Sequence, residues 1–186
     1  MTFRVKGFTT SELMVSLALA GVAMGLAVPS LAGLAENAAM VGAHNDLRTA
    51  IGYSRAQAVQ LSTPVALCAS TDLRHCSDTA NWTAGWLVFT DGDGAAGVPD
   101  AGDRVLRTWA GPGAGRVAIS ARIDEAAPAS SPGRVLRFNS LGATSPIGAA
   151  ATFNLRPANC PGTEMLLREI VVGPTGAVHN QRVACT

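Results

Sequence analysis

The chain has 186 residues, of which 48% are hydrophobic, and its formal net charge is +1 at pH 7. This length leaves room for one long apolar segment and one globular domain of roughly 150 residues. A charge so close to zero excludes attraction of nucleic acid by the overall field of the protein.

The first predicted element is an apolar helix that follows a short basic stretch. Residues 13–35 are 23 positions without a charged side chain. As a helix they measure about 35 Å, which is enough to cross a bilayer core of about 30 Å. Because Arg4 and Lys6 precede this segment, we expect the N-terminus in the cytoplasm and the rest of the chain outside.

One acid, Glu12, stands at the start of the apolar segment. An ionised side chain in hydrocarbon is costly unless it is paired, so Glu12 either lies in the headgroup layer or has a cationic partner at its depth. Cleavage after Gly7 would supply such a cation, the α-amino group of Phe8, whose reference pKa is near 8. A Sec signal peptide has a shorter apolar region, although Ala18-Leu19-Ala20 offers a small-residue cleavage site. A plain signal anchor does not explain Gly7, Phe8 and Glu12 together.

The run Gly7-Phe8-Thr9-Thr10-Ser11-Glu12 resembles the class III signal of type IV pilins and pseudopilins. The resemblance implies that a prepilin peptidase removes residues 1–7 by cutting between Gly7 and Phe8, and that the Phe8 amine is methylated. It also implies that Glu12 pairs with the Phe8 amine of a neighbouring subunit during assembly. Pro29 falls where pilin helices commonly carry a proline, which removes one backbone hydrogen bond and favours a kink.

Beyond the apolar segment, the helical pattern continues over residues 36–62 and becomes amphipathic, with apolar side chains three and four positions apart. Pro64 stops it. The rest, residues 63–186, consists of short runs rich in Val, Leu, Ile and aromatics, separated by turn residues. These runs predict strands at Val65–Ala69, Gly85–Thr90, Arg104–Ala110, Arg116–Ile123, Arg134–Asn139, Thr152–Arg156, Arg168–Val172 and Ala177–Val183. We therefore expect an α+β protein with a long N-terminal helix and an antiparallel β domain, arranged as two packed sheets.

The β region is similar to the GspH/FimT family of minor pilins and pseudopilins. The residues that carry this resemblance are Trp82 to Asp91, then Asp93-Gly94, Gly102 to Arg107, Phe138 to Gly142 and Ile170 to Gly176. The resemblance implies a β domain of the pseudopilin type outside the inner membrane. The domain plan is then a leader (1–7), a transmembrane and filament-core helix (8–35), the amphipathic half of the same helix (36–62) and a periplasmic β domain (63–186).

The four cysteines allow three pairings, and an oxidising compartment favours disulfides. Cys68 with Cys76 and Cys160 with Cys185 would each close a local loop, and we favour these two bridges. A zinc site is disfavoured because no C-x-x-C pair occurs and the histidines His44, His75 and His179 lie apart.

The sequence gives little indication of calcium binding or of catalysis. Asp91-Gly92-Asp93-Gly94 suggests calcium, but the following residues depart from an EF-hand loop, and a polar turn is the better interpretation. No hydrolase or metalloprotease motif is present. We assign Trp82, Trp86 and Trp109 to the β core or its rim. The sequence therefore predicts a non-enzymatic protein without metal or cofactor.

The function that the resemblance implies is a minor pilin or pseudopilin. Such a subunit primes, or sits near the tip of, a type IV pilus or a type II secretion pseudopilus, and its N-terminal helix contacts other pilins. The alternative is a DNA-binding pilin of the FimT kind. Those members present a C-terminal G-R-x-R motif, whereas this chain has Gly176-Ala177-Val178-His179 there, with Arg182 later. His179 and Arg182 are the remaining candidates for DNA contact, and DNA is not the favoured partner.

Overall fold

The computed structural model describes residues 7–92, 99–113, 115–123, 133–158 and 166–184, without the side chains of residues 25–33, 166 and 167. Its one long helix, α1, spans Thr10–Leu61. The helix ends where Ser62 takes a positive φ of 52°, and Pro64 follows two residues later. The predicted end of the helix is therefore confirmed.

The chain divides into two compact units, Met1–Asn37 and Ala38–Thr186. Among the described residues, no helical stretch is both long enough and apolar enough to span a bilayer.

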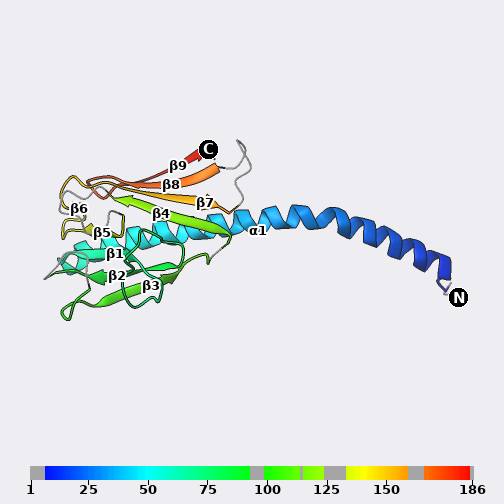
Figure 1. Ribbon diagram of the computed structural model, residues 1–186, viewed down its shortest axis with the longest axis horizontal. Coiled ribbons are helices and arrows are strands. Elements are labelled where there is room, and N and C mark those ends of the chain that lie inside the picture. The colour runs from blue at the N-terminus through cyan, green and yellow to red at the C-terminus, as the bar shows by residue number, and fades with distance from the viewer. Residues whose placement is uncertain (1–6, 93–98, 114, 124–132, 159–165, 185–186) are drawn as a thin grey trace, which may run out of the picture. The chain divides into compact units, whose positions relative to one another are not determined.

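The second unit contains two antiparallel sheets, which confirms the predicted α+β class (Figure 1). Sheet A has the strand order β3-β2-β1-β5-β6 and sheet B the order β4-β7-β8-β9. The strands are β1 (Val65–Ala69), β2 (Gly85–Thr90), β3 (Val105–Ala110), β4 (Val117–Ile123), β5 (Val135–Phe138), β6 (Thr144–Ser145), β7 (Ala151–Pro157), β8 (Leu166–Val172) and β9 (Val178–Ala184). Eight of them lie where the sequence pattern predicts a strand. The two-residue β6 was not predicted, because it is too short to show an alternating pattern.

The C-terminal half of α1 supplies the centre of the core. Leu47, Ala50 and Ile51 are fully buried and pack in one cluster with side chains from both sheets. In the same cluster the rings of Trp82 and Phe153 meet edge to face, with their centroids 4.9 Å apart. All three tryptophans are buried, as predicted.

Strands β1 and β2 are buried on both faces, since every residue of β1 and all but the last of β2 lie out of solvent. One face of these two strands packs into the central cluster around α1. The other forms a second cluster of Ala66, Cys68, Leu87 and Phe89, against which Cys76 and Val135 pack. Every described core residue lies at or beyond Ala39, so the unit Ala38–Thr186 carries the whole described core.

Candidate assembly and interaction sites

The N-terminus of α1 is closed by a reciprocal pair of side chains, Thr9 and Glu12. The backbone amide and the hydroxyl of Thr9 both donate to Oε2 of Glu12, at 3.0 and 2.9 Å. In return, the amide of Glu12 donates to the Thr9 hydroxyl at 3.3 Å. This is a capping box, in which an N-cap Thr and a Glu three residues later satisfy each other's backbone amides. The capping role of Glu12 was missed, although the T-x-x-E spacing in the sequence signals it.

Of the other predicted processing and assembly residues, two lie directly before this box and one lies within α1. Gly7 and Phe8 precede the helix and are exposed, Phe8 to 83%. Pro29 lies inside α1, whose backbone remains helical there, but its side chain is outside the described residues. The cleavage, the methylation and the kink therefore stay predictions.

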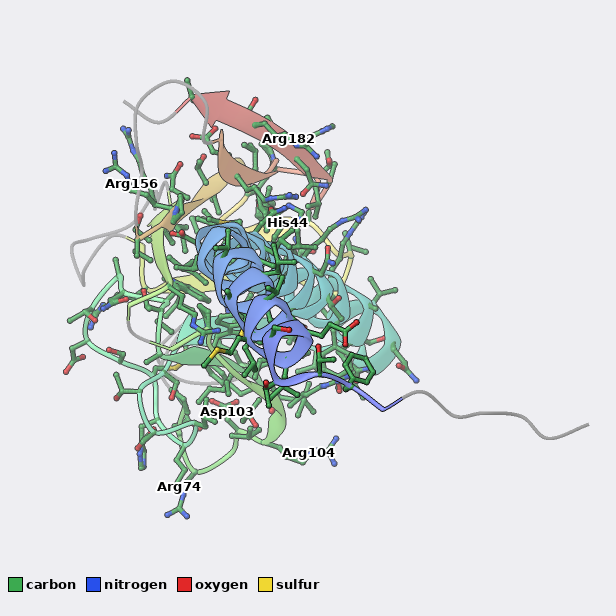
Figure 2. All side chains as sticks on the ribbon, turned by 90° about the vertical axis from the view of Figure 1, so that its right-hand side faces the viewer. His44, Arg74, Asp103, Arg104, Arg156 and Arg182 are labelled. Carbon is green, nitrogen blue, oxygen red and sulfur yellow. A yellow bond between two sulfur atoms is a disulfide. The ribbon has the colours of Figure 1, made fainter. Side chains whose placement is uncertain are left out.

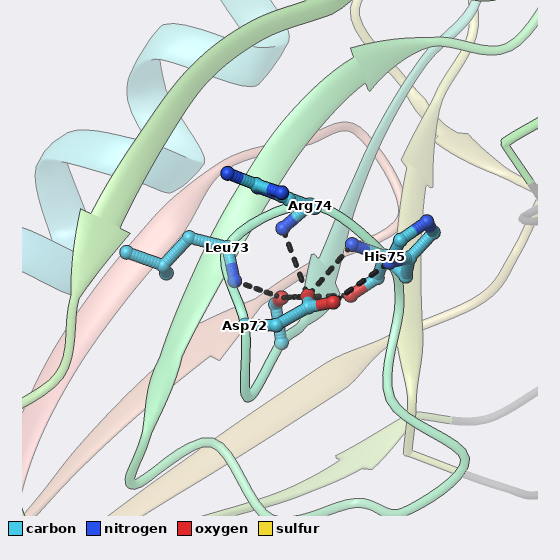
Figure 3. Close-up of polar contacts among 5 residues, drawn as sticks. Asp72, Leu73, Arg74 and His75 are labelled. Carbon is cyan, nitrogen blue, oxygen red and sulfur yellow. Dashed lines mark hydrogen bonds and ion pairs between the residues drawn. The ribbon is translucent and has the colours of Figure 1, made fainter.

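A disulfide joins Cys68 and Cys76, which confirms one of the two favoured bridges. Its loop is held by the Asp72 carboxylate, which accepts the backbone amides of Arg74 and His75, both at 2.9 Å (Figure 3). The His75 ring nitrogen Nδ1 lies 2.7 Å from the second carboxylate oxygen. These contacts, the His75 ring first, lower the pKa of Asp72 well below its usual range. These hydrogen bonds link the residues of the loop between the two cysteines. Cys160 and Cys185 lie outside the described residues, so their bridge remains a prediction.

Asp91, the last residue of the Trp82 to Asp91 motif, is fully buried and forms an ion pair. Arg137 of β5 donates from Nε to its carboxylate at 2.5 Å and from Nη2 to its backbone carbonyl at 2.6 Å. Asp91 therefore has a buried arginine partner, while the interpretation of residues 91–94 as a polar turn remains a prediction. Asp93 and Gly94 lie outside the described residues. In the described part of the chain, no group of three or more His, Cys, Asp or Glu residues is placed to hold a metal ion.

Two further segments that carry the resemblance, 138–142 and 170–176, meet against α1. Arg55 of the helix donates from Nε to the carbonyl of Gly142 at 2.9 Å. Gly142 and Gly176 have positive φ angles of 78° and 75°, and a Cβ on Gly176 would overlap the Gly142 carbonyl oxygen. Glycine is thus required at 176 both by conformation and by space.

The two candidate DNA contacts, His179 and Arg182, lie on opposite faces of β9 because they are three positions apart in a strand. Arg182 is directly opposite Arg168 of β8 in the sheet register, and His179 is opposite Val171. The sequence analysis did not single out Arg168, because only the pairing register brings it beside Arg182.

The charge of Arg168 also acts on a residue of the helix. His44 of α1 is only 8% exposed, and the side chains of Asn45 and Asn180 hydrogen-bond it. Burial is the largest cause that lowers the pKa of His44, and the charges of Arg168 and Arg48 lower it further. His44 therefore lies in a positively charged part of the fold, between α1 and the β8–β9 pair.

The sequence model of one protein family, described as type II transport protein GspH, matches residues 43–176, which is more than half of the chain. The chain belongs to the GspH family. Members of this minor pilin and pseudopilin family are structural subunits, so this GspH-family protein is a structural subunit and not an enzyme.

Two solved structures of one protein share the fold of this GspH-family chain, and a third structure is less similar. The type IV minor pilin FimU of Pseudomonas aeruginosa, in space group P21, has a TM-score of 0.54 at 18% identity over 79% of this chain and 95% of that chain. FimU in space group P65 has a TM-score of 0.52 at 16% identity, over 78% and 98%. The minor pseudopilin EpsH of the Vibrio cholerae type 2 secretion system has a TM-score of 0.41 at 12% identity, over 78% and 96%. No curated protein sequence matches the chain.

Proposed function

We propose that this protein is a minor pilin or pseudopilin that primes assembly of a type IV pilus or a type II secretion pseudopilus and stays near its tip. Residues 1–7 are the leader that prepilin peptidase removes, and residues 8–35 anchor the subunit in the inner membrane before they enter the filament core. GspH membership and the likeness to the FimU fold support this role.

The observation that carries the proposal is the apolar surface of α1 that follows Glu12. Seven of its large apolar side chains are exposed in the single chain: Leu13, Met14, Val15, Leu17, Leu19, Val22 and Met24. A continuous apolar surface of this kind requires burial in lipid or against other apolar helices. A basic leader and a single acid precede it, which is the arrangement that a filament subunit needs.

Glu12 is proposed to neutralise the Phe8 amine of a neighbouring subunit, and its capping role makes a sharp test possible. Glu12→Gln retains a side chain that can cap the helix but loses the charge, whereas Thr9→Ala removes the capping partner and keeps the charge. We expect Glu12→Gln and Glu12→Ala to enter filaments much less than the wild type, and Thr9→Ala to enter at nearly the wild-type level.

The measurement is the amount of each variant in sheared filaments relative to the amount in membranes. The β domain should remain folded in all three variants, since it carries its own described core. Normal entry of Glu12→Gln together with poor entry of Thr9→Ala would show that Glu12 acts by capping and would refute the pairing.

DNA binding is the second candidate function, and the adjacent arginines Arg168 and Arg182 are the observation that favours it. Two arginines neutralise only about two phosphates, and each phosphate contributes a slope of about −0.9 to the dependence of log K on log salt. We therefore expect the fragment 38–186 to shift DNA in a gel only at low salt. Tight binding near physiological salt that Arg182→Ala abolishes would instead identify a DNA receptor.

A further inference from the structure

The β8–β9 pair places two like charges directly opposite each other. Arg168 faces Arg182 across the strands, and one pair further along Ile170 faces Asn180. Ile170 is fully buried in the core, so this is the face of the strand pair that carries the core, and Arg168 and Arg182 share it. Directly opposed side chains have Cβ atoms only about 5 Å apart, and like charges in that position are destabilising.

A third arginine comes from α1. Arg48 follows His44 by four positions, which places both side chains on neighbouring turns of one helix face. Figure 2 shows His44 on the side of the helix that is directed toward the strand of Arg182. We call Arg48, Arg168 and Arg182 the arginine cluster: Arg168 and Arg182 are paired across β8 and β9, and the charges of Arg168 and Arg48 both act on His44.

No carboxylate in the described part of the chain forms an ion pair with this cluster. The ion pairs found there are His75–Asp72, Arg134–Asp78 and Arg137–Asp91. Glu169, the acid next to Arg168 in sequence, lies on the opposite face of β8 and accepts a hydrogen bond from Gln181 at 2.5 Å. The positive charge of the cluster is therefore not balanced by these acids.

We propose that the arginine cluster binds a carboxylate, an Asp or Glu side chain of a neighbouring protein subunit, at the rim between α1 and the β8–β9 pair. Guanidinium groups on adjacent strands present several N–H donors that match the geometry of a carboxylate. Arg168 is partly buried near the buried His44, so water competes less for its donors than for those of Arg48 and Arg182, which are exposed. The bound anion relieves the repulsion between Arg168 and Arg182.

The surroundings favour one inserted side chain over a polyanion. Ile170 and Val172 close the same face with fully buried apolar side chains, so the charged rim is short. A nucleic acid requires cations spread along an open surface to follow its phosphates. The open outer face of β8 and β9 instead has Glu169 near its middle. The identification of the partner as another subunit rests on the proposed function, whereas the binding of a carboxylate does not.

Fluorescence anisotropy of the fragment 38–186 with a labelled peptide, Gly-Asp-Gly-Asp-Gly, tests the site directly. We expect binding to this peptide and none to its Gly-Asn-Gly-Asn-Gly control. Arg168→Gln and Arg182→Gln should each weaken binding about tenfold, the typical effect of losing a charge-assisted hydrogen bond. Arg116→Gln changes an exposed arginine beside β4, outside the cluster, and should leave binding unchanged. Equal binding by all variants, or the same loss in Arg116→Gln, would overturn the proposal.

Unfolding midpoints at low salt give a second, independent measurement. Arg182→Gln removes the opposed charge, so its midpoint without peptide should rise above that of the wild type. Added Asp peptide should raise the wild-type midpoint more than that of the variant. A midpoint that does not rise would contradict the proposal.

A labelled single-stranded dT oligonucleotide is the competing probe. Tighter binding of the oligonucleotide than of the Asp peptide, with the same dependence on Arg168 and Arg182, would assign the cluster to nucleic acid instead. None of these measurements involves filaments, so they can fail or succeed independently of the Glu12 variants.

Discussion

Asp91 and Arg137 show how one buried pair holds a motif in place. The carboxylate of Asp91 is completely out of solvent, and Arg137 supplies hydrogen bonds to both its side chain and its backbone. Removing one partner from such a pair leaves an uncompensated buried charge, which costs about 3–5 kcal/mol.

Arg137→Met should therefore lower the free energy of unfolding of the fragment 38–186 by about 3–5 kcal/mol in urea titrations. The matched control is Asp78→Asn, which breaks the Arg134–Asp78 pair at the surface, where Asp78 is fully solvated. We expect at most about 1 kcal/mol from that change. Equal losses in the two variants would show that the burial of Asp91 contributes nothing.

His44 should make stability depend on pH. Its pKa in the folded protein lies below the ordinary value of 6.5, because of burial and of the charges of Arg168 and Arg48, although Asn45 and Asn180 hydrogen-bond it. As the pH falls, the unfolded chain therefore binds this proton before the folded protein does. The part of the free energy of unfolding that depends on neutral His44 is fully present above about pH 6.5 and is lost progressively below it.

Urea titrations between about pH 7.5 and about pH 5.5 measure this dependence. We expect the free energy of unfolding of the fragment 38–186 to fall over this interval, and His44→Gln to reduce the fall. His179→Gln, which changes an exposed histidine on β9, should retain the wild-type dependence. The same pH dependence in wild type and His44→Gln would refute the assignment.

At the scale of elements, Arg55, Gly142 and Gly176 join α1 to two loops that lie far apart in the sequence. A Cβ at position 176 would meet both the Gly142 carbonyl oxygen and the Arg55 side chain. At Gly148 the φ angle is also positive, 96°, but an added Cβ finds open space. A comparison of substitutions at Gly148 and Gly176 therefore separates the free-energy cost of the left-handed backbone conformation from the cost of steric overlap.

Gly148→Ala should cost about 1–2 kcal/mol, the price of a left-handed residue with a side chain. Gly176→Ala should cost about 1–3 kcal/mol more, because the loop must also move away from Gly142 and Arg55. The free energy of unfolding of the fragment 38–186 measures both. Equal costs would mean that the loops accommodate the methyl group without displacement.

At the scale of the whole molecule, the decisive prediction concerns the start of the mature chain. We expect the protein extracted from membranes to begin at Phe8 with a methylated amine, because Gly7 offers the peptidase an unhindered bond after a basic leader. Intact-mass measurement gives the answer, with Gly7→Val as the variant that should retain residues 1–7. A wild-type mass that starts at Met1, or that shows a cut after the apolar segment, would contradict the filament assignment.

The sequence by itself determined the elements of this protein and their kind. Strands such as Val65–Ala69 and Gly85–Thr90 follow from short runs of β-forming residues bounded by turn residues. The end of α1 follows from Pro64 and from the end of the helical spacing of apolar residues. The bridge between Cys68 and Cys76 follows from their closeness in the sequence. These features depend on neighbours within one turn or one loop, so a short window of sequence contains their cause.

Only the tertiary structure decided which distant side chains meet. Arg137 and Asp91 are 46 residues apart, and Arg55 and Gly142 are 87 apart. Arg168 lies opposite Arg182 only because β8 and β9 pair in one register, and a shift of one residue would turn either side chain to the other face. Strand order and register follow from how α1 and two sheets bury a common core, and no local pattern contains that information.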